Sequence, residues 1–267
     1  MEIWLPFLFA SFCYLTPSLL LFKKPKPDKK LTTFNAALVG VGLLAHFTIL
    51  RASISFHPID LSFANALIAT SFFSILIFWV LNFNKNFNYL QPFLLIPSVF
   101  LLLIHPLFSS NHFLTSDLSI LFITHIAIAL FAYSLFTFAA YLAIFILIFE
   151  KKLHQKKKID MILSGSQPLI EMENFLFNIN KIGFLLLTIT LLSGILFSEQ
   201  VFGTPLQFNH KTVFSILAWL VYGLLLMGKR LYGWRGKKSI YISLTAFLLL
   251  ALSYLGSKFV LEIILHR

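Results

Sequence analysis

The sequence has little charge and almost no cysteine. Only 12% of its 267 residues are Asp, Glu, Lys or Arg, whereas 58% are hydrophobic and 32 are Phe. A soluble domain of this length needs a charged surface, so the composition argues against a soluble fold. The one cysteine, Cys13, excludes a disulfide framework and a metal site built from several cysteines. Because Cys13 stands in an apolar run, we expect it to be a small buried residue.

Common catalytic motifs are also missing. The sequence contains no G-x-S-x-G, no H-E-x-x-H and no glycine-rich phosphate loop. These patterns supply the nucleophile, the metal ligands or the phosphate cradle in widespread enzyme classes. We therefore expect a protein that is not an enzyme.

What the sequence does contain is long apolar runs separated by short charged clusters, which is typical of membrane proteins. A helix crosses the hydrocarbon core with about 20 apolar residues. Eight such spans are predicted, near 3–22, 33–53, 61–82, 90–108, 118–149, 182–202, 210–228 and 239–264. The first opens with Glu2 rather than a basic stretch, so we expect a span and not a signal peptide. The fold class is therefore all-α, with a single polytopic membrane domain over 1–267.

Lysine and arginine gather in alternate connections between these spans. They are Lys23, Lys24, Lys26, Lys29 and Lys30, then Lys85, then Lys151, Lys152, Lys156, Lys157 and Lys158, and finally Lys229, Arg230, Arg235, Lys237 and Lys238. The other connections, 54–60, 109–117 and 203–209, contain neither residue type. Basic connections stay in the cytoplasm, so both termini are predicted to lie outside. The same bias accounts for the net charge of +11 without nucleic acid as a partner.

Residues 168–180 fit neither a span nor a loop. One helical face carries Leu169, Met172, Phe175, Leu176 and Ile179, and the opposite face carries Glu171, Glu173, Asn174 and Asn178. This pattern predicts an amphipathic helix on the inner membrane surface, before the sixth span. A simple extension of the sixth span fits the pattern equally well.

The ten acidic residues avoid the middle third of every predicted span. A proton- or sodium-coupled transporter usually needs a carboxylate near the membrane midplane. A small-solute transporter is therefore the least favoured of the function classes considered.

Histidines, in contrast, gather toward the outer side. Seven of the eight map there: His46, His57, His105, His112, His125, His210 and His266. His46 and His125 each lie about seven residues, or roughly 10 Å, from the outer end of their spans. Two neutral imidazoles at one depth on separate helices suit the two axial positions of a haem iron. A membrane histidine also often just hydrogen-bonds a neighbouring helix, so both interpretations stay open.

Four patches carry a resemblance to a known family. They are Ala45-His46-Phe47-Thr48-Ile49-Leu50-Arg51 with Pro58 and Asn65; Thr124-His125-Ile126-Ala127 with Leu130 and Ala132-Tyr133; Lys181-Ile182-Gly183-Phe184 with Leu187-Thr188 and Ser193-Gly194; and Ala218-Trp219-Leu220-Val221-Tyr222 with Gly233-Trp234-Arg235-Gly236 and Tyr254-Leu255-Gly256-Ser257. Here the chain resembles the membrane cytochrome c assembly proteins, the CcsA, CcmC and HemX group. The likeness covers most of the chain and is greatest to their small bacterial YpjD-type paralogues.

The resemblance implies haem binding or handling at the outer half of a bacterial inner membrane, with apocytochrome c or another membrane complex as partner. It matches His46 to a membrane histidine and His125 to an outer-face ligand, which makes them the candidate ligands of the haem iron. His210 and His266 are further outer-side candidates. Arg51 or Lys258 is the cation expected to meet the haem propionates.

The chain departs from the family at its outer connection and after the seventh span. Segment 199–210 has no tryptophan, whereas family members cradle haem with a tryptophan-rich loop. A family histidine aligns near Gly228 and is absent. A paralogue with these departures can keep the fold and hold haem for another partner. The rival hypothesis is a non-haem accessory subunit of another membrane complex.

Overall fold

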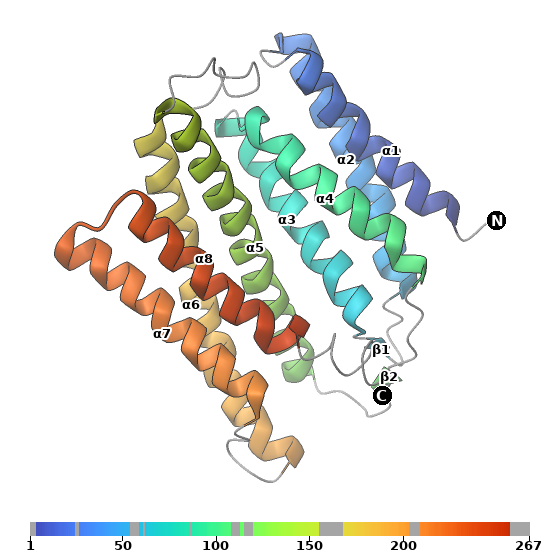
Figure 1. The fold of residues 1–267 in the computed structure, drawn as a ribbon. Coiled ribbons are helices and arrows are strands. Elements are labelled where there is room, and N and C mark those ends of the chain that lie inside the picture. The colour runs from blue at the N-terminus through green and yellow to red at the C-terminus, as the bar shows by residue number, and fades with distance from the viewer. Residues whose placement is uncertain are drawn as a thin grey trace. The chain divides into compact units, whose positions relative to one another are not determined.

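The computed structural model describes residues 4–24, 27–53, 59–60, 62–85, 87–107, 113–114, 120–154, 168–202 and 209–256. The helices among them are α1 (Trp4–Lys23), α2 (Lys29–Ser53), α3 (Phe63–Lys85), α4 (Gln91–Ile104), α5 (Ile120–His154), α6 (Leu169–Phe202), α7 (His210–Tyr232) and α8 (Lys237–Ala251) (Figure 1). Single turns extend two of them: η1 (Asn88–Leu90) and η2 (His105–Leu107) flank α4, and η4 (Leu252–Gly256) follows α8. Strands β1 (Ile59–Asp60) and β2 (Phe113–Leu114) pair antiparallel, with Ile59 opposite Leu114.

Among the residues that the structure describes, eight helices are long and apolar enough to cross a membrane, counting the turns that extend α4 and α8. Each overlaps one of the eight predicted spans, so the all-α fold with eight candidate spans is confirmed. Helix α5 has 35 residues, more than the roughly 20 that a bilayer requires. The side of the membrane on which each terminus lies stays a prediction.

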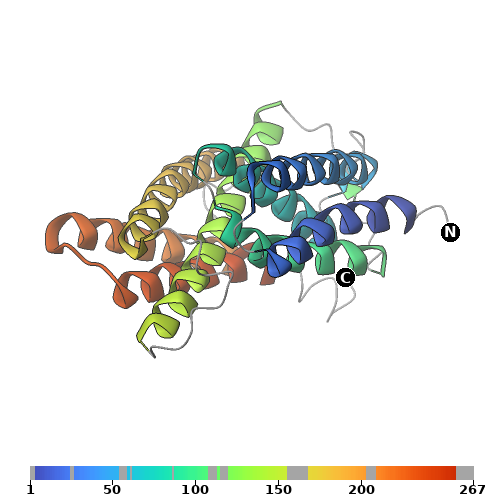
Figure 2. The ribbon, with the colours of Figure 1, turned by 90° about the horizontal axis from the view of Figure 1, so that it is seen from above.

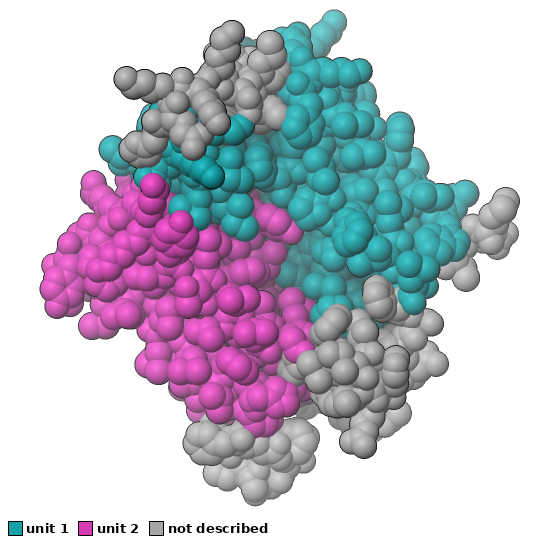
Figure 3. Space-filling view, viewed as in Figure 1, with its two compact units in different colours: residues 1–114, 144–172 teal, residues 115–143, 173–267 magenta. Residues whose placement is uncertain are grey.

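The helices form two compact units (Figure 3). Unit 1 comprises residues 1–114 and 144–172, and unit 2 comprises residues 115–143 and 173–267. Helices α5 and α6 contribute to both. The single membrane domain expected over 1–267 stays a prediction.

In unit 1, the first four helices form a closed ring of contacts. Helix α1 contacts α2 and α4, and α3 contacts the same two helices (Figure 2). Glycine permits one of these approaches, because a Cβ on Gly42 of α2 would lie 2.6 Å from the ring of Tyr14 on α1. Small residues let membrane helices pack closely, and van der Waals contact is what holds them together in lipid. Cys13, beside Tyr14, is buried as expected.

In unit 2, an aromatic and aliphatic core joins α5, α6, α7 and α8. Its buried members are Phe136, Phe177, Leu187, Ala218, Tyr222, Leu225, Ala246 and Leu250. The rings of Phe136 and Tyr222 stack with centroids 4.0 Å apart. Such a pair adds about 0.5–1.5 kcal/mol beyond its buried area. Gly183 of α6 faces Phe136 so closely that a Cβ there would lie 2.8 Å from the ring.

Segment 168–180 is the first part of α6 and continues without a break into the sixth span. The extension of that span is thus the arrangement found, and no separate surface helix forms. The reason is local, because residues 169–182 contain neither Gly nor Pro to end the helix. Its two faces are as expected except at Glu173. That side chain is only 8% exposed and accepts a hydrogen bond from the Gly236 N–H at 3.1 Å.

Candidate functional site

His46 lies inside the four-helix ring of unit 1. Its side chain, on α2, is 0% exposed. Nδ1 lies 3.3 Å from the Tyr14 hydroxyl of α1, and the ring meets Phe72 of α3 edge-on at 5.4 Å between centroids. An imidazole enclosed by two aromatic rings is held in one orientation by packing and by the contact with Tyr14.

The other nitrogen of His46 has no hydrogen-bond partner in the part of the chain that the structure describes. The backbone of Ile68 on α3 is close enough to interact electrostatically, but no hydrogen bond of normal geometry forms. Buried polar atoms are almost always paired, so an orphaned Nε2 needs an explanation. A nitrogen with this chemistry is suited to bind a metal or a polar ligand.

A second histidine, His105, lies in the same unit and contacts α1 and α3 about two helical turns away from His46. Its Nε2–H donates to Asn65 Oδ1 of α3 at 2.8 Å, and its ring stacks on Phe7 of α1 at 5.3 Å. Phe7 precedes Tyr14 by seven residues, and Asn65 precedes Phe72 by seven. Seven residues rise roughly 10 Å along a helix, so His46 and His105 occupy successive layers between α1 and α3.

His125 belongs to unit 2, on α5, and is partly buried. Its Nδ1 lies 2.7 Å from Ser193 Oγ of α6. The single proton of Ser193 points to backbone carbonyls of its own helix, Ile189 at 2.8 Å and Thr190 at 3.1 Å. Ser193 is therefore the acceptor, and Nδ1 of His125 carries the proton. Histidines that bind metals are commonly oriented by such a bond, which leaves Nε2 as the ligand atom.

Two of the other candidate residues are less confined. Arg51, near the end of α2, and His210, the first residue of α7, are both exposed. Lys258 and His266 lie outside the described residues. His46 and His125 belong to different units, so their pairing on one iron stays a prediction. Among the described residues, no three His, Cys, Asp or Glu side chains gather as a metal-binding group.

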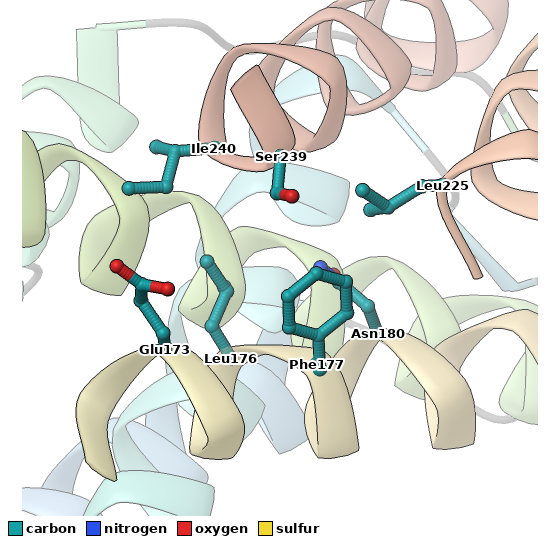
Figure 4. A pocket seen from close by; sticks show the side chains of 7 residues that line it. All are labelled: Glu173, Leu176, Phe177, Asn180, Leu225, Ser239 and Ile240. Atoms are coloured by element: carbon teal, nitrogen blue, oxygen red, sulfur yellow. The ribbon is translucent and has the colours of Figure 1, made fainter. Parts of the chain in front are cut away.

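A hollow in unit 2 does not serve as a cofactor site. It is lined by Glu173, Leu176, Phe177, Asn180, Leu225, Ser239 and Ile240 (Figure 4). The side chains leave no room for a molecule of the size of water, and a cofactor pocket needs about 300 Å³ or more.

Tyr14 is the site residue that the sequence did not reveal. Its signal was its seven-residue spacing from Phe7, but that spacing recurs along any apolar helix. The pairing of His105 with Asn65 was equally hidden, although Asn65 stood in the first patch of resemblance.

Comparison with known proteins places the chain in a family. A family model described as cytochrome C assembly protein matches residues 34–265. The inner membrane protein YpjD of Escherichia coli K12 is 34% identical over 145 residues, which cover 53% of this chain and 52% of YpjD. The cytochrome c biogenesis protein CcsA of Chlamydomonas reinhardtii is 27% identical over 139 residues, 52% of this chain and 38% of that protein. CcsA of Marchantia polymorpha is 30% identical over 90 residues, which cover 34% of this chain and 28% of that protein.

The chain thus spans about half the length of YpjD and less of the CcsA proteins. The resemblance seen in the four sequence patches is confirmed, and the two histidines of those patches, His46 and His125, lie in the matched region. Helix α1, which carries Tyr14, precedes that region. Because the match covers most of its residues, this chain belongs to the cytochrome c assembly protein family.

Proposed function

We propose that this protein binds haem in the outer half of a bacterial inner membrane and serves the assembly of c-type cytochromes. The observation that carries the proposal is the fully buried imidazole of His46, whose Nε2 has no partner among the described residues. Family membership supports it, as do the names of the relatives, an inner membrane protein and cytochrome c biogenesis proteins. The partner is apocytochrome c or another membrane complex.

The donor groups present fit haem. Haem, when bound, would supply an iron that imidazole nitrogens can ligate. His46 and His125 are the residues that would hold it. Ser193 accepts the proton of His125 Nδ1 and so orients that ring, and Nε2 of His46 has no hydrogen-bond partner among the described residues.

The remaining residues orient the ligands and balance charge. Tyr14 restrains the ring of His46 from α1, and Ser193 restrains the ring of His125 from α6. Arg51 is an exposed cation five residues after His46 and is suited to a propionate. No step of this role requires a nucleophile or a general acid, so the protein acts by binding and positioning rather than by catalysis.

Optical spectroscopy of the detergent-purified protein tests the proposal. Protein produced with ample haem should show a Soret band, with sharp α and β bands after reduction. A colourless protein that co-purifies with a fixed membrane partner would instead favour the non-haem accessory subunit.

A further inference from the structure

The turn that joins α7 and α8 concentrates positive charge. Five cations lie within ten residues, Lys229, Arg230, Arg235, Lys237 and Lys238. Both helices are candidate spans. The turn between them therefore lies at a membrane surface, whichever side that surface faces.

This turn is built rigidly. Gly233 ends α7 in the left-handed conformation, with φ of 64°, which favours glycine. The N–H of Trp234 then donates to the carbonyl of Gly228 at 3.2 Å, and its indole ring packs over Gly228 with no room for a Cβ. The Glu173 carboxylate fastens the end of the turn through the Gly236 N–H at 3.1 Å.

Aromatic rings hold two of the ammonium groups of the turn in place. The ammonium of Lys238 lies 3.9 Å from the ring centroid of Trp234, and that of Lys229 lies 4.3 Å from the ring centroid of Phe177. Arg230 and Arg235 are exposed, and neither forms a salt bridge with any residue that the structure describes. Arg230 stands just before the turn and Arg235 within it, and guanidinium groups can bind a phosphate in bidentate fashion.

An exposed apolar stripe on α7 leads to these cations. Its residues alternate in steps of four and three: Val213, Leu217, Leu220, Leu224, Met227 and Leu231. The last of them directly follows Arg230, and Tyr232, at the end of the helix, is 75% exposed. A tyrosine at this level is typical of the membrane interface, where its ring meets the lipid headgroups.

We propose that the α7–α8 turn binds one anionic phospholipid. The phosphate contacts Arg230, Arg235 and Lys238, and an acyl chain lies along the α7 stripe toward Leu220. The stripe favours a lipid over a free phosphate or an acidic protein, because the surface of α7 next to the cations offers only apolar contacts. This site is separate from the proposed haem site and does not depend on it.

Native mass spectrometry of the delipidated full-length protein tests this proposal, with dioleoylphosphatidylglycerol as the probe and dioleoylphosphatidylcholine as the uncharged comparison. We expect one phosphatidylglycerol to bind at least tenfold more tightly than phosphatidylcholine. The pair Arg230→Gln and Arg235→Gln should remove that preference. The control pair Lys29→Ala and Lys30→Ala, which also removes two exposed cations beside a candidate span, should retain it.

Three outcomes would overturn the proposal. Equal binding of the two lipids by the wild-type protein would show that the headgroup is not recognised. If inorganic phosphate displaced phosphatidylglycerol at an equal concentration, the apolar stripe would contribute nothing to binding, and the ligand would be a free anion. Displacement of phosphatidylglycerol by an acidic peptide at lower concentration would identify a protein partner instead. The wild-type comparison of the two lipids remains decisive even where the arginine variants fail to fold.

Discussion

Unit 1 and unit 2 each hold one candidate haem histidine, and they position it differently. In unit 1, His46 is completely enclosed, and its hydrogen-bond contact with Tyr14 is long at 3.3 Å. In unit 2, His125 is partly exposed, and its contact to Ser193 is short at 2.7 Å. Aromatic packing therefore dominates the orientation of the first ring, and a hydrogen bond dominates that of the second.

A histidine can thus be oriented for the same ligand either by aromatic packing or by a hydrogen bond. A packed ring keeps its direction even when its hydrogen bond is weak, because aromatic neighbours block its other rotamers. A partly exposed ring relies on its hydrogen bond, because water competes for the same nitrogen. Removing the polar partner should thus matter less for His46 than for His125.

The largest expected effect concerns the side on which both histidines lie. A reporter that is active only outside the membrane should work when fused at Asn111 or after Arg267, and be silent when fused at Gln155 or Gly236. The reason is the alternation of lysine-rich and lysine-free connections. Activity at Gln155 would reverse the orientation and place both candidate ligands near the inner surface.

The next effect tests whether the two histidines act together. His46→Ala and His125→Ala should each remove most of the bound haem or leave it five-coordinate, as read from the optical spectrum. The double variant should be no worse than the more damaging single one, because either change already breaks the same six-coordinate site. His112→Ala is the control and should leave the spectrum unchanged.

Added imidazole sharpens this test. It should restore the spectrum of His125→Ala at a lower concentration than that of His46→Ala, because only His125 reaches the surface in its own unit. Losses that multiply in the double variant would mean that the two histidines bind independently.

A smaller effect on haem binding is expected from changing Ser193 and Tyr14, the residues that orient the two histidines. Ser193→Ala should weaken haem binding by about tenfold, within the usual range for residues that orient a metal ligand. Tyr14→Phe should weaken it less, because Phe keeps the packing on His46 and loses only a long contact. Haem titration measures both, and a shift of the reduction potential distinguishes altered ligand orientation from misfolding. A larger loss for Tyr14→Phe than for Ser193→Ala would contradict the comparison.

The smallest effect lies outside the spans, at Asp28. Its carboxylate accepts hydrogen bonds from the Lys24 ammonium at 2.8 Å and the Leu31 N–H at 2.9 Å, and these lower its pKa. A lowered pKa stabilises the fold above the unfolded value of about 3.9, and this stabilisation is lost as the pH falls through the lower, folded value. Asp28→Asn should therefore lower the Tm slightly at pH 7 and leave a smaller difference at pH 3, as thermal unfolding in detergent would show. An undiminished difference at pH 3 would exclude the carboxylate charge as the cause.

The spans and the family followed from local patterns. Apolar runs of about 20 residues predict helices because lipid requires every backbone group to be bonded within the helix. The patches around His46 and His125 predict the family because they are short and contiguous. The local pattern of segment 168–180 did not determine its structure, since it fitted both a surface helix and the extension of the sixth span that the structure shows.

The sequence by itself determined how many helices form, where the lysine-rich connections fall and which histidines lie within spans. Hydropathy and charge are properties of the individual residues, so their pattern along the chain predicts the spans and the basic connections. Only the tertiary structure decided that Tyr14 of α1 meets His46, that Asn65 meets His105 and that Ser193 assigns the proton of His125. Those partners are 32, 40 and 68 residues apart. They meet because α1 packs on α2, α3 on α4, and α5 beside α6, and no local pattern specifies how one helix is rotated against another.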